Sequence, residues 1–309
     1  MNEFELIDEI TSNFRQQSNV VLGPGDDAAI LATPDARVAV STDILVEGVH
    51  FRQEWTTPYQ LGRRTAAQNF ADIAAMGGRP TALVVGVAAP RSRDPLWFTE
   101  VSRGLQDECD LVGASVIGGD LSSGQQLMIA ATVLGDLDGR PPVTRSGANV
   151  GDLVAVAGRL GWSAAGLAAL QAGADIDSAY LDAYRAPTPP YAAGIAAALA
   201  GATAMIDVSD GLLADAAHIA VASKVTINLD SSLLRPDAVL EDAAVVLGRN
   251  ARDFVLSGGE DHALLAVFPG DARVPDAFRI IGHVETRGAH AVVVDGFEHL
   301  GTQGHDHFG

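Results

Sequence analysis

The sequence predicts an α+β protein built from two mixed α/β domains, and three observations lead to that prediction. The chain has 309 residues, which is more than one hydrophobic core usually fills. Strand-like and helix-like segments alternate in both halves of the chain. A polar segment with two prolines and three glycines, residues 136–152, separates the halves. We therefore expect an N-terminal domain at residues 1–140 and a C-terminal domain at residues 150–309.

The first domain is expected to contain three helices and four strands. Hydrophobic residues at helical spacing predict an N-terminal helix over residues 4–14. Thr57-Pro58 and Asp94-Pro95 each place a capping side chain before a proline, and Gly77-Gly78 ends the first of these two helices. Runs of small and β-branched residues predict the strands, at residues 38–42, 83–88, 115–118 and 127–134.

The second domain is rich in alanine and has no fixed-period repeat. Helical periodicity predicts three helices, at residues 163–171, 191–200 and 212–223. Short apolar runs predict five strands, at residues 153–157, 225–229, 263–267, 279–284 and 291–294.

The composition excludes several classes of protein. Hydrophobic residues make up 48% of the chain, which is too many for intrinsic disorder. Lys and Arg number 20 against 39 Asp and Glu, a net charge of -19. Such a chain repels phosphate backbones and anionic lipid, so we expect no nucleic-acid or membrane partner. An anionic substrate would need a divalent metal to offset this charge.

The expected location is the cytoplasm. Cys109 is the only cysteine, so the chain can form neither an intramolecular disulfide nor a zinc site of several thiolates. The N-terminus is acidic and lacks the pattern of a secretory signal. The longest apolar stretch, residues 194–206, is shorter than a membrane helix.

Several acidic residues stand where we expect strands to end, most of them close to a glycine. One such residue is ordinary turn chemistry, but a group of carboxylates at the ends of strands repels itself unless a cation neutralises it. Mg²⁺ prefers carboxylate oxygen and commonly shares its ligands with substrate phosphates. The residues concerned are Asp26, Asp27, Asp43, Asp120, Asp207, Asp210, Glu260 and Asp261.

Asp72 lies inside the helix that begins at Pro58, on one face with Thr65, Asn69 and Met76. A buried carboxylate there would need a cation or hydrogen-bond donors. Two interpretations stay open, a metal ligand and a solvent-facing polar stripe.

The sequence also limits how phosphate could be bound. Lys224 is the only lysine and follows no glycine-rich loop, so neither a P-loop nor a protein-kinase lysine is present. Metals and arginines would have to hold the phosphates. Arg145 is a candidate clamp, although the sequence alone favours a solvated linker arginine. His50 could contact substrate or be a structural histidine, and His299, His305 and His307 could bind metal or belong to a polar tail.

Taken together, these motifs resemble those of the thiamine-monophosphate kinase family, within the aminoimidazole-ribonucleotide synthetase-like ATP enzymes. The resemblance runs almost from end to end and includes Gly25-Asp26-Asp27, Ser41-Thr42-Asp43 and Gly258-Gly259-Glu260-Asp261. The other matching segments are residues 48–51, 69–77, 117–120, 144–148 and 206–212.

The resemblance implies ATP-dependent phosphorylation of thiamine monophosphate to thiamine diphosphate, by direct in-line transfer. It implies that ATP is contacted by Gly119, Asp120, Arg145 and Ser209, and thiamine monophosphate by His50 and Glu260. Turnover would depend on Asp43 and Asp210. Several Mg²⁺ ions would be held by Asp27, Ser41, Thr42, Asp43, Asp72, Asp120, Asp207 and Asp210.

The family also implies a homodimer in which N-terminal sheets pair, with an active-site cleft completed by the C-terminal domain. Two features depart from its pattern. His305 stands where members have an aromatic residue that stacks on the substrate, and residues 95–111 lack a tyrosine near the nucleotide. Two alternatives remain: another ATP-dependent ligase or cyclase of the superfamily, and a non-catalytic protein that binds divalent ions or thiamine.

Overall fold

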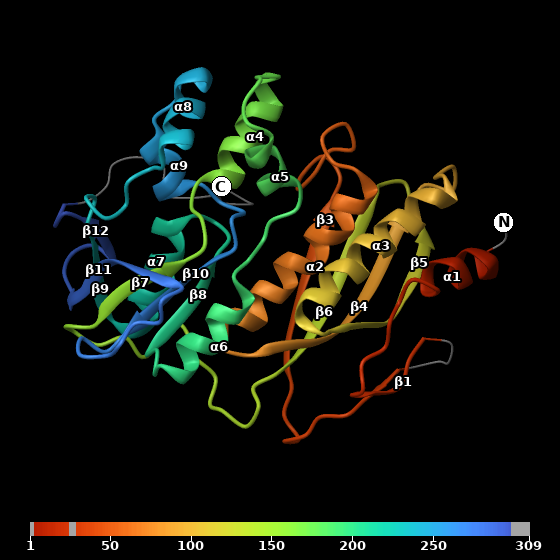
Figure 1. Cartoon of the computed structure of the whole chain (residues 1–309), viewed down its shortest axis with the longest axis horizontal. Helices are drawn as coiled ribbons and strands as arrows, with labels where there is room; N and C mark the ends of the chain where they lie inside the picture. Colours follow the sequence, from red (N-terminus) through yellow and green to blue (C-terminus); the bar gives the residue numbers. More distant parts are fainter. Residues whose placement is uncertain (1–2, 25–28, 298–309) are drawn as a thin grey trace. The chain divides into compact units, whose positions relative to one another are not determined.

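The computed structural model describes residues 3–24 and 29–297 and divides into two compact units, each with its own sheet (Figure 1). Unit 1 comprises Met1–Ile73 and Gly78–Arg140, and unit 2 comprises Ala74–Gly77 and Pro141–Gly309. Mixed helix and sheet in both units confirms the predicted fold class. Within the described residues, no helix is both long and apolar enough to cross a membrane.

Unit 1 contains a four-stranded sheet in the order β3-β6-β4-β5. β6 runs antiparallel to both β3 and β4, whereas β4 and β5 are parallel and are joined through α3. β1 and β2 form a separate two-stranded sheet that the sequence analysis did not predict. The elements are α1 (Glu3–Thr11), β1 (Val20–Leu22), β2 (Ile30–Leu31), β3 (Ala39–Val46), α2 (Pro58–Ala75), β4 (Arg79–Ala89), α3 (Pro95–Val112), β5 (Ser115–Ser123) and β6 (Met128–Asp136).

Helices α2 and α3 begin where the sequence predicts. The Asp94 carboxylate accepts a hydrogen bond of 3.0 Å from the amide of Leu96, and the Gln60 amide donates to the Thr57 hydroxyl at 3.2 Å. The two helices pack closely through glycines. A Cβ atom at Gly104 would lie 2.0 Å from the carbonyl oxygen of Tyr59, so no larger residue fits there without movement.

The opposite face of the unit 1 sheet exposes apolar side chains. Alternation along β3 turns Leu45 into the core and leaves Val40 and Ile44 59% and 48% exposed. Val84 on β4 is 37% exposed. It lies on the same face as Val40 and Ile44, because it pairs with Thr132 of β6, which pairs with Thr42 of β3. Contiguous apolar surface of this kind is typical of an interface.

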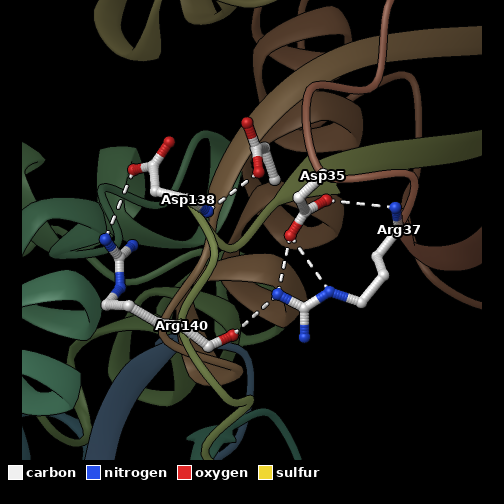
Figure 2. Close-up of polar contacts among 5 residues, drawn as sticks. Asp35, Arg37, Asp138 and Arg140 are labelled. Atoms are coloured by element: carbon white, nitrogen blue, oxygen red, sulfur yellow. Dashed lines mark hydrogen bonds and ion pairs between the residues drawn. The ribbon is translucent and has the colours of Figure 1, made fainter.

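A network of charged side chains ties the segment before β3 to the segment after β6 (Figure 2). The Arg37 guanidinium donates to Asp35 at 2.6 Å and to the carbonyl oxygen of Arg140 at 3.4 Å. The Asp136 carboxylate accepts from the amide of Asp138 at 2.8 Å. The pKa of Asp35 is lowered chiefly by its hydrogen bond from Arg37. Arg37 thus has Asp35 as its carboxylate partner, and Arg140 has Asp138 at 3.4 Å. Both partners are close by in the chain, so the network is structural.

Unit 2 contains a six-stranded sheet in the order β12-β9-β11-β7-β10-β8, antiparallel except where β12 and β9 pair. The predicted strands and helices are present, and β8, α5, α8 and α9 are additional to them. The elements are β7 (Leu153–Ala157), α4 (Trp162–Ala172), α5 (Ser178–Arg185), α6 (Tyr191–Leu199), β8 (Ala204–Val208), α7 (Leu212–Ser223), β9 (Val225–Leu229), α8 (Ala238–Leu247), α9 (Ala251–Ser257), β10 (Ala263–Phe268), β11 (Phe278–Thr286) and β12 (Val292–Val294).

Both faces of this sheet are covered, which explains why β8 and β10 are buried at every position. One face packs against α4, α7, α8 and α9. The other packs against α6 and against Ala74 and Ala75, the last two residues of α2. Gly194 of α6 lies so close to this segment that a Cβ atom would be 2.0 Å from the Ala74 carbonyl oxygen. Ala74–Gly77 is therefore part of the unit 2 core.

Candidate functional site

Apart from Asp27 and Asp120, the carboxylates predicted to bind metal form one group in each unit. In unit 1, the Ser41 hydroxyl on β3 donates to the Asp72 carboxylate on α2 at 2.6 Å. Asp43 is two residues beyond Ser41, and so lies on the same helix-covered face of the sheet. This group combines two carboxylates and a hydroxyl, all oxygen ligands of the kind that Mg²⁺ prefers.

The predicted polar face of α2 is buried in the structure. Thr65 and Asn69 are 1% and 0% exposed, and each bonds a carbonyl of the preceding turn, Thr65 to Leu61 and Asn69 to Thr65. The interpretation of this face as a solvent-facing stripe is therefore wrong. Asp72 is half-buried at the end of that face.

Two other predicted ligands in unit 1 lie on the opposite face of the sheet. Asp120 of β5 pairs with Gly86 of β4, which pairs with Ala130 of β6, which in turn pairs with Ile44 of β3. Residues that pair across strands lie on the same face, so the Asp120 side chain is on the exposed apolar face. Thr42 shares that face and donates to the carbonyl oxygen of Ala131 at 2.9 Å. Within one copy of the chain, Thr42 and Asp120 are thus separated by the sheet from Ser41 and Asp43.

The expectation that Asp43 and Asp120 mark strand ends is wrong. β3 continues to Val46 and β5 to Ser123, because pairing with β6 and β4 extends both strands beyond their acidic residues. Gly119 precedes Asp120 where β5 approaches β4 closely. A Cβ atom there would lie 2.0 Å from the carbonyl oxygen of Val85, which makes glycine necessary.

His50 lies in the turn after β3. The backbone amide of Val46 donates to its Nδ1 at 3.0 Å. A nitrogen that accepts a hydrogen bond carries no proton, so the neutral ring must hold its proton on Nε2. The turn therefore sets both the position and the tautomer of this imidazole.

In unit 2, the acidic group surrounds the end of β8 and the start of α7. Asp207 is buried in β8, and Asp210 follows in the turn before α7. One oxygen of Asp215, in the first turn of α7, accepts from the amides of Asp210 and Gly211, each at 3.1 Å. Burial and the charges of Asp207 and Asp210 raise the pKa of Asp215 to about 7. Three carboxylates therefore sit close enough to repel one another.

The sequence analysis missed Asp215 and His218 as members of this group. Ligand atoms of Asp210, Asp215 and His218 lie within 4.8 Å of one another. Their spacing in the sequence was a usable signal, because a helix that begins at Leu212 places Asp215 and His218 one turn apart. In the described part of the chain, no arginine or lysine forms an ion pair with Asp207, Asp210 or Asp215. The charge of this group fits a divalent cation.

The loop Gly258–His262 is joined to the same strand end. The amide of Glu260 donates to the Ser209 carbonyl oxygen at 2.7 Å, and the amide of His262 donates to the Val208 carbonyl oxygen at 2.9 Å. Asp261 instead accepts from the amides of Gly161 and Ser163, at 2.5 and 2.8 Å. That carboxylate caps α4, whose own N-cap residue is a glycine without a side chain.

Arg145 is exposed and lines an open hollow of about 430 Å³ beside α7, together with His218. Its guanidinium has no carboxylate partner within the residues that the structure describes. A basic side chain without a partner at the rim of a hollow suits an anionic ligand. The remaining predicted site residues, Asp27 and His305, lie outside the described residues.

Comparison with known proteins identifies the family. Residues 25–137 match the model for the AIR synthase related protein, N-terminal domain, and residues 149–295 match the model for its C-terminal domain. The chain is 48% identical over 310 aligned residues to the thiamine-monophosphate kinase of Mycobacterium tuberculosis, covering 100% of this chain and 92% of the relative. The chain belongs to the thiamine-monophosphate kinase family. This confirms the resemblance found in the sequence.

Two solved structures extend the similarity to the fold. The thiamine-monophosphate kinase of Stenotrophomonas maltophilia is 33% identical, with a TM-score of 0.82 over 96% of this chain and 98% of the other. AaThiL complexed with AMPPCP and TMP is 30% identical, with a TM-score of 0.82 over 98% of this chain and 97% of the other. Family membership thus covers both units.

Proposed function

We propose that this chain transfers the γ-phosphoryl group of ATP to thiamine monophosphate, giving thiamine diphosphate and ADP. The observation that carries the proposal is 48% identity to a thiamine-monophosphate kinase along the whole chain. A related structure with similar fold was solved with both AMPPCP and TMP. The only cysteine, Cys109, is buried and free, which suits a reducing compartment, so we also infer a cytoplasmic location.

We propose that Mg²⁺ is the metal, held by Ser41, Asp43 and Asp72 in unit 1 and by Asp207 and Asp210 in unit 2. Asp27, Thr42 and Asp120 complete the proposed set of ligands. The fit rests on the donor atoms, which are carboxylate and hydroxyl oxygens, and on the carboxylates of Asp207, Asp210 and Asp215, which form no ion pair with an arginine or lysine among the described side chains. Bound Mg²⁺ would neutralise the phosphates of both substrates.

The protein's side chains then have to position two anionic substrates, ATP and thiamine monophosphate. They do not have to remove a proton from the acceptor phosphate. The second pKa of a phosphate monoester is about 6, so the acceptor oxygen is already ionised near neutral pH. We therefore assign no general base. Gly119, Asp120, Arg145 and Ser209 are proposed to bind ATP, and His50, Glu260 and His305 to bind thiamine monophosphate. The tautomer of His50 places its ring proton on Nε2, which is the atom that we propose donates to a substrate oxygen.

The test is a comparison of acceptors with matched variants. Wild-type protein given ATP and Mg²⁺ should form thiamine diphosphate from thiamine monophosphate, and little product from thiamine. Asp43→Asn and Asp210→Asn should each lower kcat by at least about 100-fold, since each removes a charge next to the transferring group. Asp242→Asn makes the same change on the exposed surface of α8 and serves as control.

Three results would count against the proposal. ADP release with a different product would favour another ligase or cyclase of the superfamily. Binding of Mg²⁺ or thiamine monophosphate without turnover would favour a non-catalytic protein. Near-normal activity of Asp43→Asn or Asp210→Asn in saturating Mg²⁺ would contradict the assigned roles.

We also propose a homodimer formed through the exposed apolar face of the unit 1 sheet. Val40 and Ile44 give this face an apolar surface suited to a second copy. Thr42 and Asp120 lie on the same face, so we propose that their contacts with metal and ATP form only in the dimer. Sedimentation equilibrium should give twice 32.0 kDa.

Ile44→Glu should shift this mass to that of one chain and abolish turnover, because a charge would be buried in the interface. Val245→Glu, at an 80% exposed position on α8, is the matched control and should stay dimeric and active. A wild-type monomer with full activity would refute the dimer.

A further inference from the structure

His262 is a buried side chain placed beside two residues with proposed roles. Its Nδ1 is 3.1 Å from one carboxylate oxygen of Asp207, and its Nε2 is 3.9 Å from a carboxylate oxygen of Glu260. The side chains of His262 and Asp207 are only 7% and 8% exposed. The first distance is that of a hydrogen bond, whereas the second is too long for one.

The chemistry of the pair determines the direction of the hydrogen bond. An ionised carboxylate has no proton to donate, so the Nδ1–H of His262 must donate to Asp207. That bond occupies one oxygen of Asp207 and fixes the plane of its carboxylate, leaving the other oxygen for a cation. Hydrogen bonds to a metal-binding carboxylate commonly orient it in this way.

The backbone around His262 is held in an uncommon conformation. Its φ is +51°, and that of Glu260 is +68°, values that side-chain-bearing residues rarely adopt. The amides of both residues donate to the end of β8, at Val208 and Ser209. Strained residues persist where the surrounding structure over-determines them, and they concentrate at functional sites. Here the two backbone hydrogen bonds hold the loop where the imidazole contacts Asp207.

We propose that His262 is a positioning residue that orients the Asp207 carboxylate for metal binding through its Nδ1–H. The inference rests on the proposed function, in which Asp207 is a Mg²⁺ ligand. Nothing in the sequence pattern pointed to this residue, because the contact joins the start of β10 to the end of β8, and their register pairs Leu264 with Asp207.

Two substitutions distinguish the roles of the two ring nitrogens of His262. His262→Asn places an amide nitrogen where Nδ1 was, and asparagine tolerates a positive φ. His262→Gln reaches the position of Nε2 and lacks a donor at that of Nδ1. His283→Asn, on the exposed part of β11, is the control.

The primary measurement is binding of Mn²⁺, as a spectroscopic substitute for Mg²⁺, followed by electron paramagnetic resonance without nucleotide. Asp207→Asn identifies the signal that depends on Asp207. We expect His262→Asn and His283→Asn to keep wild-type affinity for that ion, and His262→Gln to lose about 10- to 100-fold, the usual loss when a residue that orients a ligand is replaced. In turnover, His262→Gln should raise the Mg²⁺ concentration for half-maximal rate and leave the KM for thiamine monophosphate unchanged.

Several results would overturn the inference. Equal Mn²⁺ affinity in wild type and both His262 variants would show that the bond does not orient Asp207. Equal losses in both variants, with lowered thermal midpoints, would show a purely structural role. Retention by His262→Gln and loss by His262→Asn would assign the effect to Glu260. If Mn²⁺ binding depends on Asp207 and His262 as expected but no thiamine diphosphate forms, the proposed function fails while this inference stands.

Discussion

Replacing Asp215 with asparagine should make the metal-free protein more stable at alkaline pH. Burial and two neighbouring carboxylates raise the pKa of Asp215 from 3.8 to about 7. When folding raises the pKa of a carboxyl group, the group stabilises the fold fully at pH below its pKa in the unfolded chain. This stabilisation is lost as the pH rises through its pKa in the folded protein. At about 1.4 kcal/mol per pH unit between the two values, the loss reaches about 4 kcal/mol by pH 8.5. Asp215 is 2% exposed, so solvent screens little of this cost.

The assay is differential scanning calorimetry in a chelator at pH 5.0 and 8.5. Between these values, the thermal midpoint of wild type should fall by up to about 10 °C more than that of Asp215→Asn. The asparagine oxygen can still accept from the amides of Asp210 and Gly211, so the cap survives. Mg²⁺ should reduce the difference at pH 8.5 because a cation favours the ionised carboxylate. An identical pH dependence of the two proteins in chelator would refute the reasoning.

Three further predictions concern the helices of unit 1. Gly104→Ala should lower the free energy of unfolding by about 1–3 kcal/mol in chemical denaturation, because its Cβ atom would meet the Tyr59 carbonyl at 2.0 Å; a stabilised variant would disprove the close packing. Asp94→Ala should cost about 1 kcal/mol in the same measurement, and Asp94→Asn should cost little, since asparagine also caps helices; equal losses would argue against the cap. Burial raises the pKa of the Cys109 thiol, so a chromogenic disulfide reagent should react with it only after unfolding, and rapid reaction of native protein would contradict its burial.

Local signals predicted much of the fold. The starts of α2 and α3 could be read from Thr57 and Asp94, because a helix cap is an interaction between residues two or three apart. The additional helices α8 and α9 carried the same kind of signal, with Asp237 and Asn250 as their caps. Their short and partly exposed apolar patterns concealed it.

Pairing between distant segments could not be read from the sequence. The length of β3 depends on its register with β6, so Asp43 looked like the end of a strand although it lies inside one. The same strand register places Thr42 and Asp120 on the face of the sheet opposite Ser41. The role of His262 depends on contact with Asp207, which is 55 residues away in the chain. Such contacts are set by tertiary structure and leave no periodic pattern.

The place of Ala74–Gly77 in the core of unit 2 has a consequence for synthesis on the ribosome. These residues leave the exit tunnel with the rest of α2, but Gly194, against which Ala74 packs, is made about 120 residues later. At about 5–20 residues per second, the nascent chain waits roughly 6–24 s before that contact can form. The end of α2 thus stays without this neighbour while about 120 further residues are made, and separate expression of residues 141–309 would omit a piece of their own core.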